Sequence, residues 1–275
     1  MISTRTLLTN RYWLDQLVMP HLTREAWRAR DLATGRAVTV WRPGAFPAAD
    51  AECFLAEVAQ TVRIRHPAVA RILDFGVAEP DGVPFVVTEP ADGPSLAAIM
   101  RAGPLDPPWV LDIVRQVASA LSDVEGRGLR LAVNPWSLRL APGGAVKIGG
   151  FDLRQEADRR TDGPGESLYR LGLVAWGCLS GESPTVATWQ DESLAGYVRQ
   201  AATPLSSLPD TVPPGIAMLA ADLTTAGSPA RRVGDVVARC GELLAAPMRA
   251  RQPGRSSGPG ETSLLDTLEG ELRCA

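Results

Sequence analysis

The chain has 275 residues, of which 45% are hydrophobic and 21% are charged, a balance that excludes a mostly disordered protein. With 28 basic and 31 acidic residues the formal net charge is −3, so no basic excess favours nucleic acid as a partner. Apolar runs such as Leu171–Cys178 are far shorter than the roughly 20 residues that span a bilayer. Because Met1–Asn10 also lacks the apolar core of a signal peptide, we expect a cytoplasmic protein with no membrane span.

The first third of the chain is predicted to form strands around one helix. Three short segments rich in apolar, aromatic or β-branched residues are predicted strands: 12–18, 25–31 and 37–42. Apolar residues then recur at helical spacing before Pro67: Ala51, Leu55, Val58 and Val62. Two further strands are predicted at 69–75 and 84–89, with a Pro-Asp-Gly turn between them.

From Gly93 onward the pattern becomes mainly helical. Ser95 can cap a short helix that ends near Met100, and Asp106 followed by two prolines is a helix-start signal. Apolar stripes predict helices over these ranges: 106–124, 168–179, 216–223 and 233–244. Segments 138–140 and 145–148, joined by Pro-Gly-Gly, are predicted to form a hairpin. Strands first and helices after indicate an α+β fold with two lobes.

We divide the chain into four parts. A short extension at 1–10 precedes an N-terminal lobe at 11–92 and a mostly helical lobe at 93–247. Residues 248–275 are interpreted as a flexible linker, rich in Gly, Pro and Ser, and a short amphipathic tail. Because an isolated short helix is marginal in water, the tail is either a docking peptide or a frayed end.

Two residue types that carry much of enzyme chemistry are scarce. Only one basic residue is a lysine, Lys147, and the histidines are His21 and His66. Any reaction that needs a lysine must therefore use Lys147. The four cysteines have neither C-x-x-C spacing nor a nearby histidine, which argues against a metal or redox site. We expect no metal and interpret the thiols as buried or incidental.

Several local phrases, in the order in which they occur, resemble a bacterial serine/threonine protein kinase domain over roughly residues 11–244. The matching phrases include Arg65-His66-Pro67, Asp92-Gly93-Pro94-Ser95-Leu96, Val146-Lys147-Ile148 and Leu168-Tyr169-x-Leu171-Gly172. No phrase is specific by itself, but their order and nearly gap-free spacing are. The resemblance implies a protein-kinase-like two-lobed fold: an antiparallel sheet with one major helix in the N-lobe, and a mostly helical C-lobe.

The same resemblance indicates what stands where the family holds ATP. Trp41 replaces the third-strand lysine, and its indole is expected to fill the space of an adenosine phosphate. Arg42 follows but is predicted to point to the opposite face of the strand. The helix glutamate of the family is retained as Glu57. The loop after Leu17 has no glycine, and Pro20 removes a backbone amide that could approach a phosphate.

The catalytic loop of the family also differs in this chain. With one residue deleted after Gly128, the proton-accepting aspartate becomes Ala132, the lysine Asn134 and the metal-binding asparagine Ser137. Without the deletion, Val133 takes the aspartate position. In either alignment the base is missing, and the resemblance therefore implies that phosphoryl transfer lacks its proton acceptor.

The D-F-G metal motif of the family reads Gly150-Phe151-Asp152 here. The required carboxylate is absent at Gly150, and one follows at Asp152. A slipped loop in which Asp152 binds magnesium is conceivable, but one carboxylate without the other groups would hold metal and ATP poorly.

These losses together imply a pseudokinase, a catalytically inactive protein-kinase-like domain that acts as a protein-binding or allosteric regulatory module in bacterial signalling. We expect neither ATP nor magnesium as a cofactor. The expected partner is a protein: an active kinase, a phosphopeptide reader or an enzyme that the domain regulates. The alternative is a residual nucleotide-binding switch or atypical phosphotransferase using Glu57 and Asp152. A third possibility is a small ligand in the former nucleotide cleft, beside Thr88 at the gatekeeper position and Ala91 in the hinge.

Overall fold

The computed structural model describes residues 6–20, 24–43, 46, 50–124, 130–151, 165–182, 208–225 and 232–245. These residues belong to one compact unit, Met1–Ala245. The second unit, Ala246–Ala275, lies outside the described residues, so the linker and tail at 248–275 stay a prediction.

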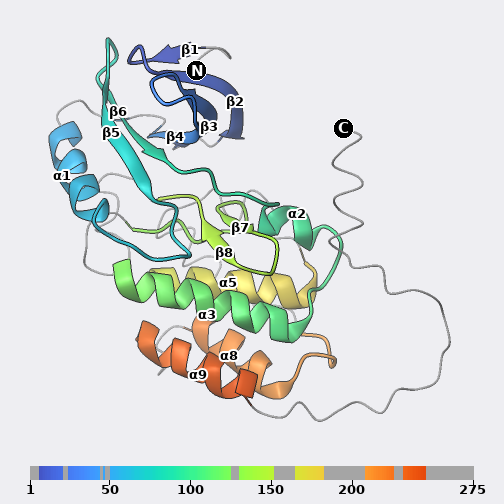
Figure 1. Cartoon of the computed structure of the whole chain (residues 1–275). Coiled ribbons are helices and arrows are strands. Elements are labelled where there is room, and N and C mark those ends of the chain that lie inside the picture. The colour runs from blue at the N-terminus through green and yellow to red at the C-terminus, as the bar shows by residue number, and fades with distance from the viewer. Residues whose placement is uncertain are drawn as a thin grey trace. The chain divides into compact units, whose positions relative to one another are not determined.

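The N-lobe is built on one antiparallel sheet in the strand order β1-β2-β3-β4-β6-β5 (Figure 1). Its strands have these bounds: β1 Thr6–Leu8, β2 Tyr12–Pro20, β3 Arg24–Asp31, β4 Ala37–Pro43, β5 Ile72–Ala78 and β6 Val83–Thr88. Helix α1 (Ala51–Thr61) packs Phe54 and Val58 into the same core cluster as Ile72 of β5 and Val86 of β6. The apolar spacing along the helix therefore becomes its buried face.

Alternation along β4 divides its side chains between two cores. Val38 and Val40 belong to a cluster with Trp27 of β3, whereas Trp41 joins the main cluster. Successive residues of a strand point to opposite faces of the sheet. The Val-x-Val-Trp pattern therefore places the indole on the side of the sheet opposite the two valines.

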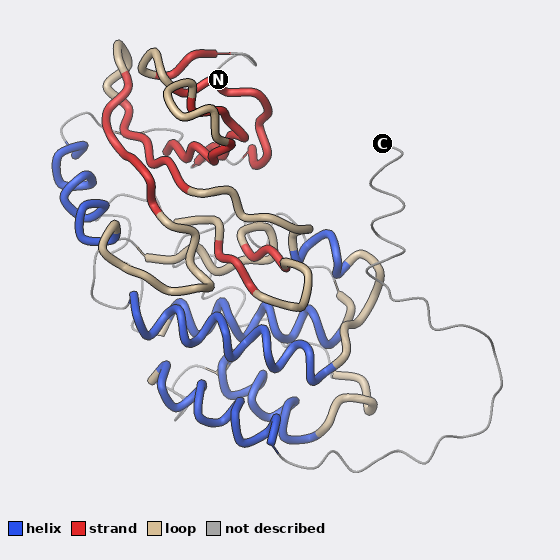
Figure 2. Tube along the Cα trace, in the orientation of Figure 1, coloured by secondary structure: helices blue, strands red, loops and turns tan. Residues whose placement is uncertain are grey.

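The C-lobe is mostly helical, apart from one small hairpin (Figure 2). Its elements have these bounds: α2 Leu96–Met100, α3 Pro107–Val124, β7 Leu138–Leu140, β8 Val146–Ile148, α5 Glu166–Ser180, α8 Pro214–Thr224 and α9 Val233–Ala245. Helix α3 packs against α5 and α9, and α5 packs against α8. The hairpin β7–β8 lies between the N-lobe sheet and helix α3 (Figure 1).

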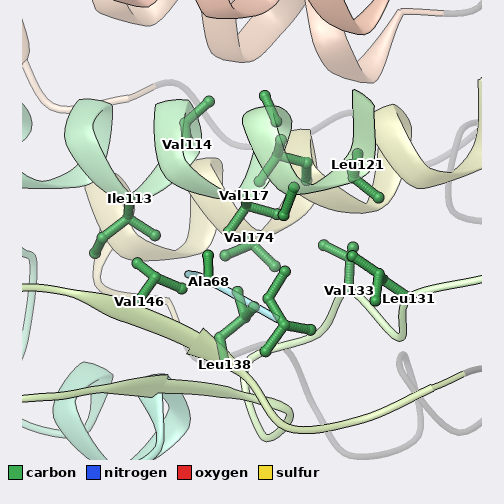
Figure 3. Packing of buried hydrophobic residues seen from close by; sticks show 14 of the residues in the cluster. Ala68, Ile113, Val114, Val117, Leu121, Leu131, Val133, Leu138, Val146 and Val174 are labelled. Atoms are coloured by element: carbon green, nitrogen blue, oxygen red, sulfur yellow. The ribbon is translucent and has the colours of Figure 1, made fainter. Parts of the chain in front are cut away.

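The core of the C-lobe forms where the hairpin meets these helices. Val117 of α3 points toward Val174 of α5 and toward Leu138 of the hairpin, whereas Val114 points to the opposite side of the helix (Figure 3). Burying each side chain of this size stabilises the fold by about 1.5–3 kcal/mol. The stripe that the sequence predicts along α3 is therefore the surface that holds the lobe together.

One predicted strand boundary is wrong. The strand expected at 69–75 begins only at Ile72 and continues to Ala78. Residues 68–70 pair instead with β8 of the C-lobe: the Ala70 N–H donates to the Ile148 carbonyl at 3.0 Å, and the Ile148 N–H donates to the Ala68 carbonyl at 2.7 Å. The apolar run at 68–75 therefore pairs with β8 in its first part and joins the N-lobe sheet in its second part. The sequence pattern does not show where one pairing ends and the other begins.

Strand β1 was not among the predicted elements. Thr6–Leu8 lies inside the segment interpreted as an extension, yet it pairs with β2 through Leu7↔Trp13 and forms the edge of the sheet. A run of three residues is too short to give a strand signal by alternation.

The described residues contain no helix long and apolar enough to cross a bilayer. In the same part of the chain, no three His, Cys, Asp or Glu side chains gather into a group that could hold a metal. Cys178 and Cys240 are buried, and burial raises the pKa of both thiols to about 12. These two thiols therefore stay protonated and serve as packing groups.

Candidate functional site

The region between the lobes begins at Trp41 on β4. Its side chain is 4% exposed, and the indole Nε1 donates a hydrogen bond to Thr88 Oγ1 at 3.2 Å. Strand pairing sets this contact, because Thr39↔Thr88 and Trp41↔Val86 are directly opposed on β4 and β6. The indole is thus satisfied by the residue that the resemblance places at the gatekeeper position.

Four of the predicted site positions meet around Gly150. A Cβ atom built onto Gly150 would lie 3.2 Å from the Ser137 Cβ, 3.3 Å from the Trp41 Cη2 and 3.5 Å from the Ala132 Cβ. Such distances are at or below ordinary van der Waals contact. We call Trp41, Thr88, Ala132, Ser137 and Gly150 the inter-lobe site. Trp41, Ala132 and Ser137 occupy the space beside Gly150, and a carboxylate side chain at position 150 would have to displace them.

The loop 132–137 uses its polar groups to hold its own backbone. Asn134 is buried, and its Oδ1 accepts hydrogen bonds from the N–H groups of Trp136 at 3.0 Å and Ser137 at 2.9 Å. The Ser137 hydroxyl donates to the carbonyl oxygen of Ala132. Both side chains that stand at the family's lysine and asparagine positions therefore act as local braces, a usual role for Asn and Ser in tight turns.

Backbone pairing brings this loop against the segment that carries Gly150. The Ala132 N–H donates to the Gly150 carbonyl at 3.1 Å, and Leu131 bridges to Phe151, which is fully buried. The predicted hinge residue Ala91 lies close by, since a Cβ atom on Gly149 would be 3.0 Å from the Ala91 Cβ. Glycine at 149 and 150 thus permits a close approach of three segments.

The remaining predicted cleft residues are described in part. Glu57 is half-buried on α1, whereas Asp152 lies outside the described residues. Strands β2 and β3 pair as far as Pro20↔Glu25, which is the hairpin where the family has its glycine-rich loop. The alternative in which Glu57 and Asp152 act together therefore stays a prediction.

Arg42 points away from the inter-lobe site, as predicted. Its side chain is nearly buried on the other face of β4, and its Nη2 lies 2.6 Å from Asp81 Oδ2. Arg42 consequently cannot replace the lysine that Trp41 displaces.

The only lysine of the chain contacts residues outside the inter-lobe site. Lys147 Nζ is 2.7 Å from Glu89 Oε1 and donates to the Pro67 carbonyl at 3.1 Å. Partial burial alone would raise the pKa of Glu89, but the hydrogen bond from Lys147 and further hydrogen bonds and charges hold that pKa below its ordinary value. Lys147 therefore fastens β8 to the hinge and to the segment that follows α1.

Comparison with known proteins shows that the chain is similar in sequence to bacterial kinases. No protein-family model matches it. The serine/threonine-protein kinase PknA of Mycobacterium tuberculosis is 26% identical over 289 aligned positions, covering 91% of this chain and 66% of that kinase. The kinase PknB of Mycolicibacterium smegmatis is 26% identical over 67% of this chain, and pkn3 of Myxococcus xanthus is 36% identical over 44% of it. Over most of its length the chain is thus similar in sequence to bacterial serine/threonine protein kinases.

Solved kinase structures match the fold. The crystal structure of the Mycobacterium tuberculosis PknI kinase domain aligns with a TM-score of 0.62 at 19% identity, covering 88% of this chain and 99% of that chain. A double mutant of the same domain aligns with a TM-score of 0.66 at 20% identity. The protein kinase fold predicted from the sequence is therefore confirmed. The chain spans 66% of the length of PknA and 35% of the length of PknB.

The ion pairs of Glu166 were not predicted from the sequence. Glu166 at the start of α5 lies 2.7 Å from Arg170 Nη2, and its other oxygen is 3.5 Å from Arg130 Nη1. The pair 166–170 has the i,i+4 spacing that a helical sequence could have indicated. Nothing local in the sequence points to Arg130, which ties the loop before Ala132 to α5.

Proposed function

We propose that this kinase-family chain is a pseudokinase, a catalytically inactive domain that acts as a protein-binding or allosteric regulatory module in bacterial signalling. The packing at Gly150 carries the proposal. Trp41, Ala132, Ser137 and Gly150 stand where the resemblance places the lysine, the base and both metal ligands. The first three lie close around Gly150, and none of the four carries a charge.

Phosphoryl transfer depends on charges that this arrangement lacks. Mg²⁺ prefers carboxylate oxygens and water, and the transferring phosphate needs cationic or backbone N–H donors. The side chains of Trp41, Ala132 and Gly150 offer neither a carboxylate for the metal nor a cation for the phosphate. The loss of one such electrostatic contact costs about 3–4 kcal/mol of transition-state stabilisation, so the loss of several removes most of the rate.

The first test is ADP formation and phosphoprotein formation by the full chain with ATP and either Mg²⁺ or Mn²⁺. A bacterial serine/threonine kinase domain serves as the positive control, and Asp152→Ala serves as the matched variant. We expect the same background signal from the wild type and the variant. Metal-dependent turnover that Asp152→Ala abolishes would overturn the proposal in favour of an atypical phosphotransferase using Glu57 and Asp152.

The second test addresses the regulatory role. We propose that the partner is a protein: an active kinase, a phosphopeptide reader or an enzyme under its control. Candidate proteins are assayed for activity and for binding with and without equimolar full chain. A saturable change in a candidate's kcat/KM or peptide affinity supports the role. If all three classes bind without any change in activity or affinity, the domain is not a regulator of them.

A further inference from the structure

Backbone hydrogen bonds join the two lobes between β8 and the segment that precedes β5. The Ala70 N–H donates to the Ile148 carbonyl at 3.0 Å, and the Ile148 N–H donates to the Ala68 carbonyl at 2.7 Å. Val69 forms a parallel bridge with Ile148, and all four residues are buried. A strand of the C-lobe is therefore paired with the segment that leads into the N-lobe sheet.

Lys147 adds a side-chain contact at the same strand. Val146 and Ile148 are buried, so the Lys147 side chain between them points to the other face of β8. Its Nζ atom lies 2.7 Å from Oε1 of Glu89, which directly follows β6, and it donates to the Pro67 carbonyl at 3.1 Å. One ammonium group of the C-lobe is thus bound to two separate segments of the N-lobe.

The N-lobe itself positions the carboxylate that Lys147 meets. The Glu89 N–H donates to the Arg71 carbonyl at 3.0 Å, and Arg71 Nε lies 3.9 Å from Glu89 Oε2. The side chains of Glu89 and Lys147 are 29% and 26% exposed, so water and salt screen their attraction less than that of a surface pair. The contact therefore joins two groups that are each held by their own lobe.

Other ion pairs between described residues lie within a single lobe. Arg42 of β4 pairs with Asp81 in the turn between β5 and β6, and Arg239 pairs with Glu242 within α9. Such pairs stabilise one lobe without affecting the position of the other. The pair that Lys147 forms differs, because its two members belong to different lobes.

The lobes also touch at the inter-lobe site, but through apolar groups. A Cβ atom built onto Gly150 of the C-lobe would lie 3.3 Å from the indole of Trp41 in the N-lobe. Apolar attraction is non-directional, so this contact keeps the lobes close without selecting one orientation. Hydrogen bonds are directional, so the contacts of Lys147 can select it.

We propose that Lys147, Glu89 and the Pro67 carbonyl form an inter-lobe clasp, which holds the two lobes in one relative position and must open before they can move apart. The clasp depends on the ammonium group, because both N-lobe acceptors bind it. The inference goes beyond the proposed function. It concerns the motion of the lobes, and the ADP and partner assays above do not depend on it.

The test is amide hydrogen exchange of the full chain, followed residue by residue by NMR. Exchange of a protected amide reports the opening of its hydrogen bond, whether by local separation or by global unfolding. The Ala70 and Ile148 amides report on the bonds between the lobes. The Asp31 and Leu105 amides, which are bonded within the N-lobe and within the C-lobe, are the internal reference.

The variants are Lys147→Met, Glu89→Gln and the two combined. Methionine keeps an unbranched apolar side chain but removes the charge and the donors. Arg239→Gln is the matched control, since it removes an ion pair that lies within one helix.

We expect the Ala70 and Ile148 amides to exchange about tenfold faster or more in Lys147→Met, as for the loss of a charge-assisted hydrogen bond. The two reference amides should keep their rates. The combined variant should exchange at about the rate of Lys147→Met, because its second change removes a partner that is already lost. Arg239→Gln should leave all four rates unchanged.

Three results would overturn the proposal. Unchanged rates at Ala70 and Ile148 in Lys147→Met would mean that the lobes stay together without the clasp. An equal acceleration at the Asp31 and Leu105 amides would mean that Lys147 stabilises the whole fold and not the relative position of the lobes. Additive effects of the two single variants would mean that the two side chains act independently.

Discussion

The Arg11 cluster of the N-lobe and the inter-lobe site use polar groups in opposite ways. In the Arg11 cluster (Arg11, Tyr12, Asp31 and Asp74), the guanidinium lies 2.9 Å from both Asp31 and Asp74, and the Tyr12 hydroxyl donates to Asp74. These contacts hold the pKa of Asp31 well below its usual range, with the hydrogen bonds from Arg11 as the largest cause. At the inter-lobe site, by contrast, a tryptophan, an alanine, a glycine and two hydroxyl side chains pack together.

The two regions show that charged groups have different roles in different parts of the fold. Paired charges remain where they join distant strands, as Arg11 does by linking β3 to β5. Where the family places charges for phosphate and metal, this chain has packing groups. The kinase fold therefore forms in this chain with packing groups at these positions, which is consistent with the binding role proposed above.

Removal of the Trp41 indole should have the largest effect on the free energy of unfolding. Trp41→Ala should lower the free energy of unfolding by about 3–5 kcal/mol, because it empties a nearly buried site. Trp13→Ala is the matched control, since Trp13 on β2 is 36% exposed and should lose much less. Urea denaturation measures both. Equal losses would mean that Trp41 is not a packing residue of this site.

Removing the charge of Asp31 tests the other side of the comparison. Asp31→Asn should lower the free energy of unfolding by about 2 kcal/mol. Arg11 loses its charged acceptor, while the Asn side chain keeps the shape of Asp. Since the pKa of Asp31 is depressed in the folded state, its contribution is present at neutral pH and is lost as pH falls below the ordinary carboxyl value of about 3.9.

The difference in stability between wild type and Asp31→Asn should therefore shrink in acid. Denaturation at a series of pH values follows it, with the exposed Asp15→Asn as the control. A difference that is constant down to the lowest pH would show that the charge of Asp31 adds nothing.

A double-mutant cycle sharpens the packing argument at Gly150. Gly150→Ala should lower the free energy of unfolding by about 1–2 kcal/mol, because the new methyl group meets Ser137 and Trp41 at 3.2 and 3.3 Å. In a Trp41→Phe background the cost should be smaller, since the shorter ring leaves room. Gly241→Ala in α9 is the control with open space around it and should stabilise slightly. Additive costs would place Trp41 and Gly150 out of contact.

The smallest predicted effect concerns His66, which lies outside both regions. Its Nδ1 accepts a hydrogen bond from the Ala68 N–H at 3.1 Å, so Nε2 carries the proton and donates to Ser119 Oγ at 3.2 Å. Burial lowers the pKa of His66. The unfolded chain therefore takes up the proton first, and stability should fall as pH drops below about 6.5.

His66→Gln should remove this part of the pH dependence between about pH 7 and 5, as measured by thermal unfolding. An unchanged pH profile would assign the loss of stability to other groups.

The sequence alone predicts most of the fold, because the apolar periodicity is strong in α3, α5 and β4. The sequence does not predict strand boundaries where neighbouring residues pair with different elements. Val69, for example, bridges to β8 instead of joining β5. The sequence identifies Trp41 and Gly150 as departures from the family. It does not show that they touch, because that contact depends on segments more than 100 residues apart in the chain.

The most direct test of the central claim is the thermal unfolding midpoint of the full chain with ATP and Mg²⁺. Inorganic triphosphate at the same concentration serves as the reference, since it carries the phosphates without the adenosine. We expect ATP with Mg²⁺ to raise the midpoint no more than triphosphate does. A larger, metal-dependent rise that Asp152→Ala abolishes would contradict it, because the inter-lobe site would then hold a nucleotide as an active kinase does.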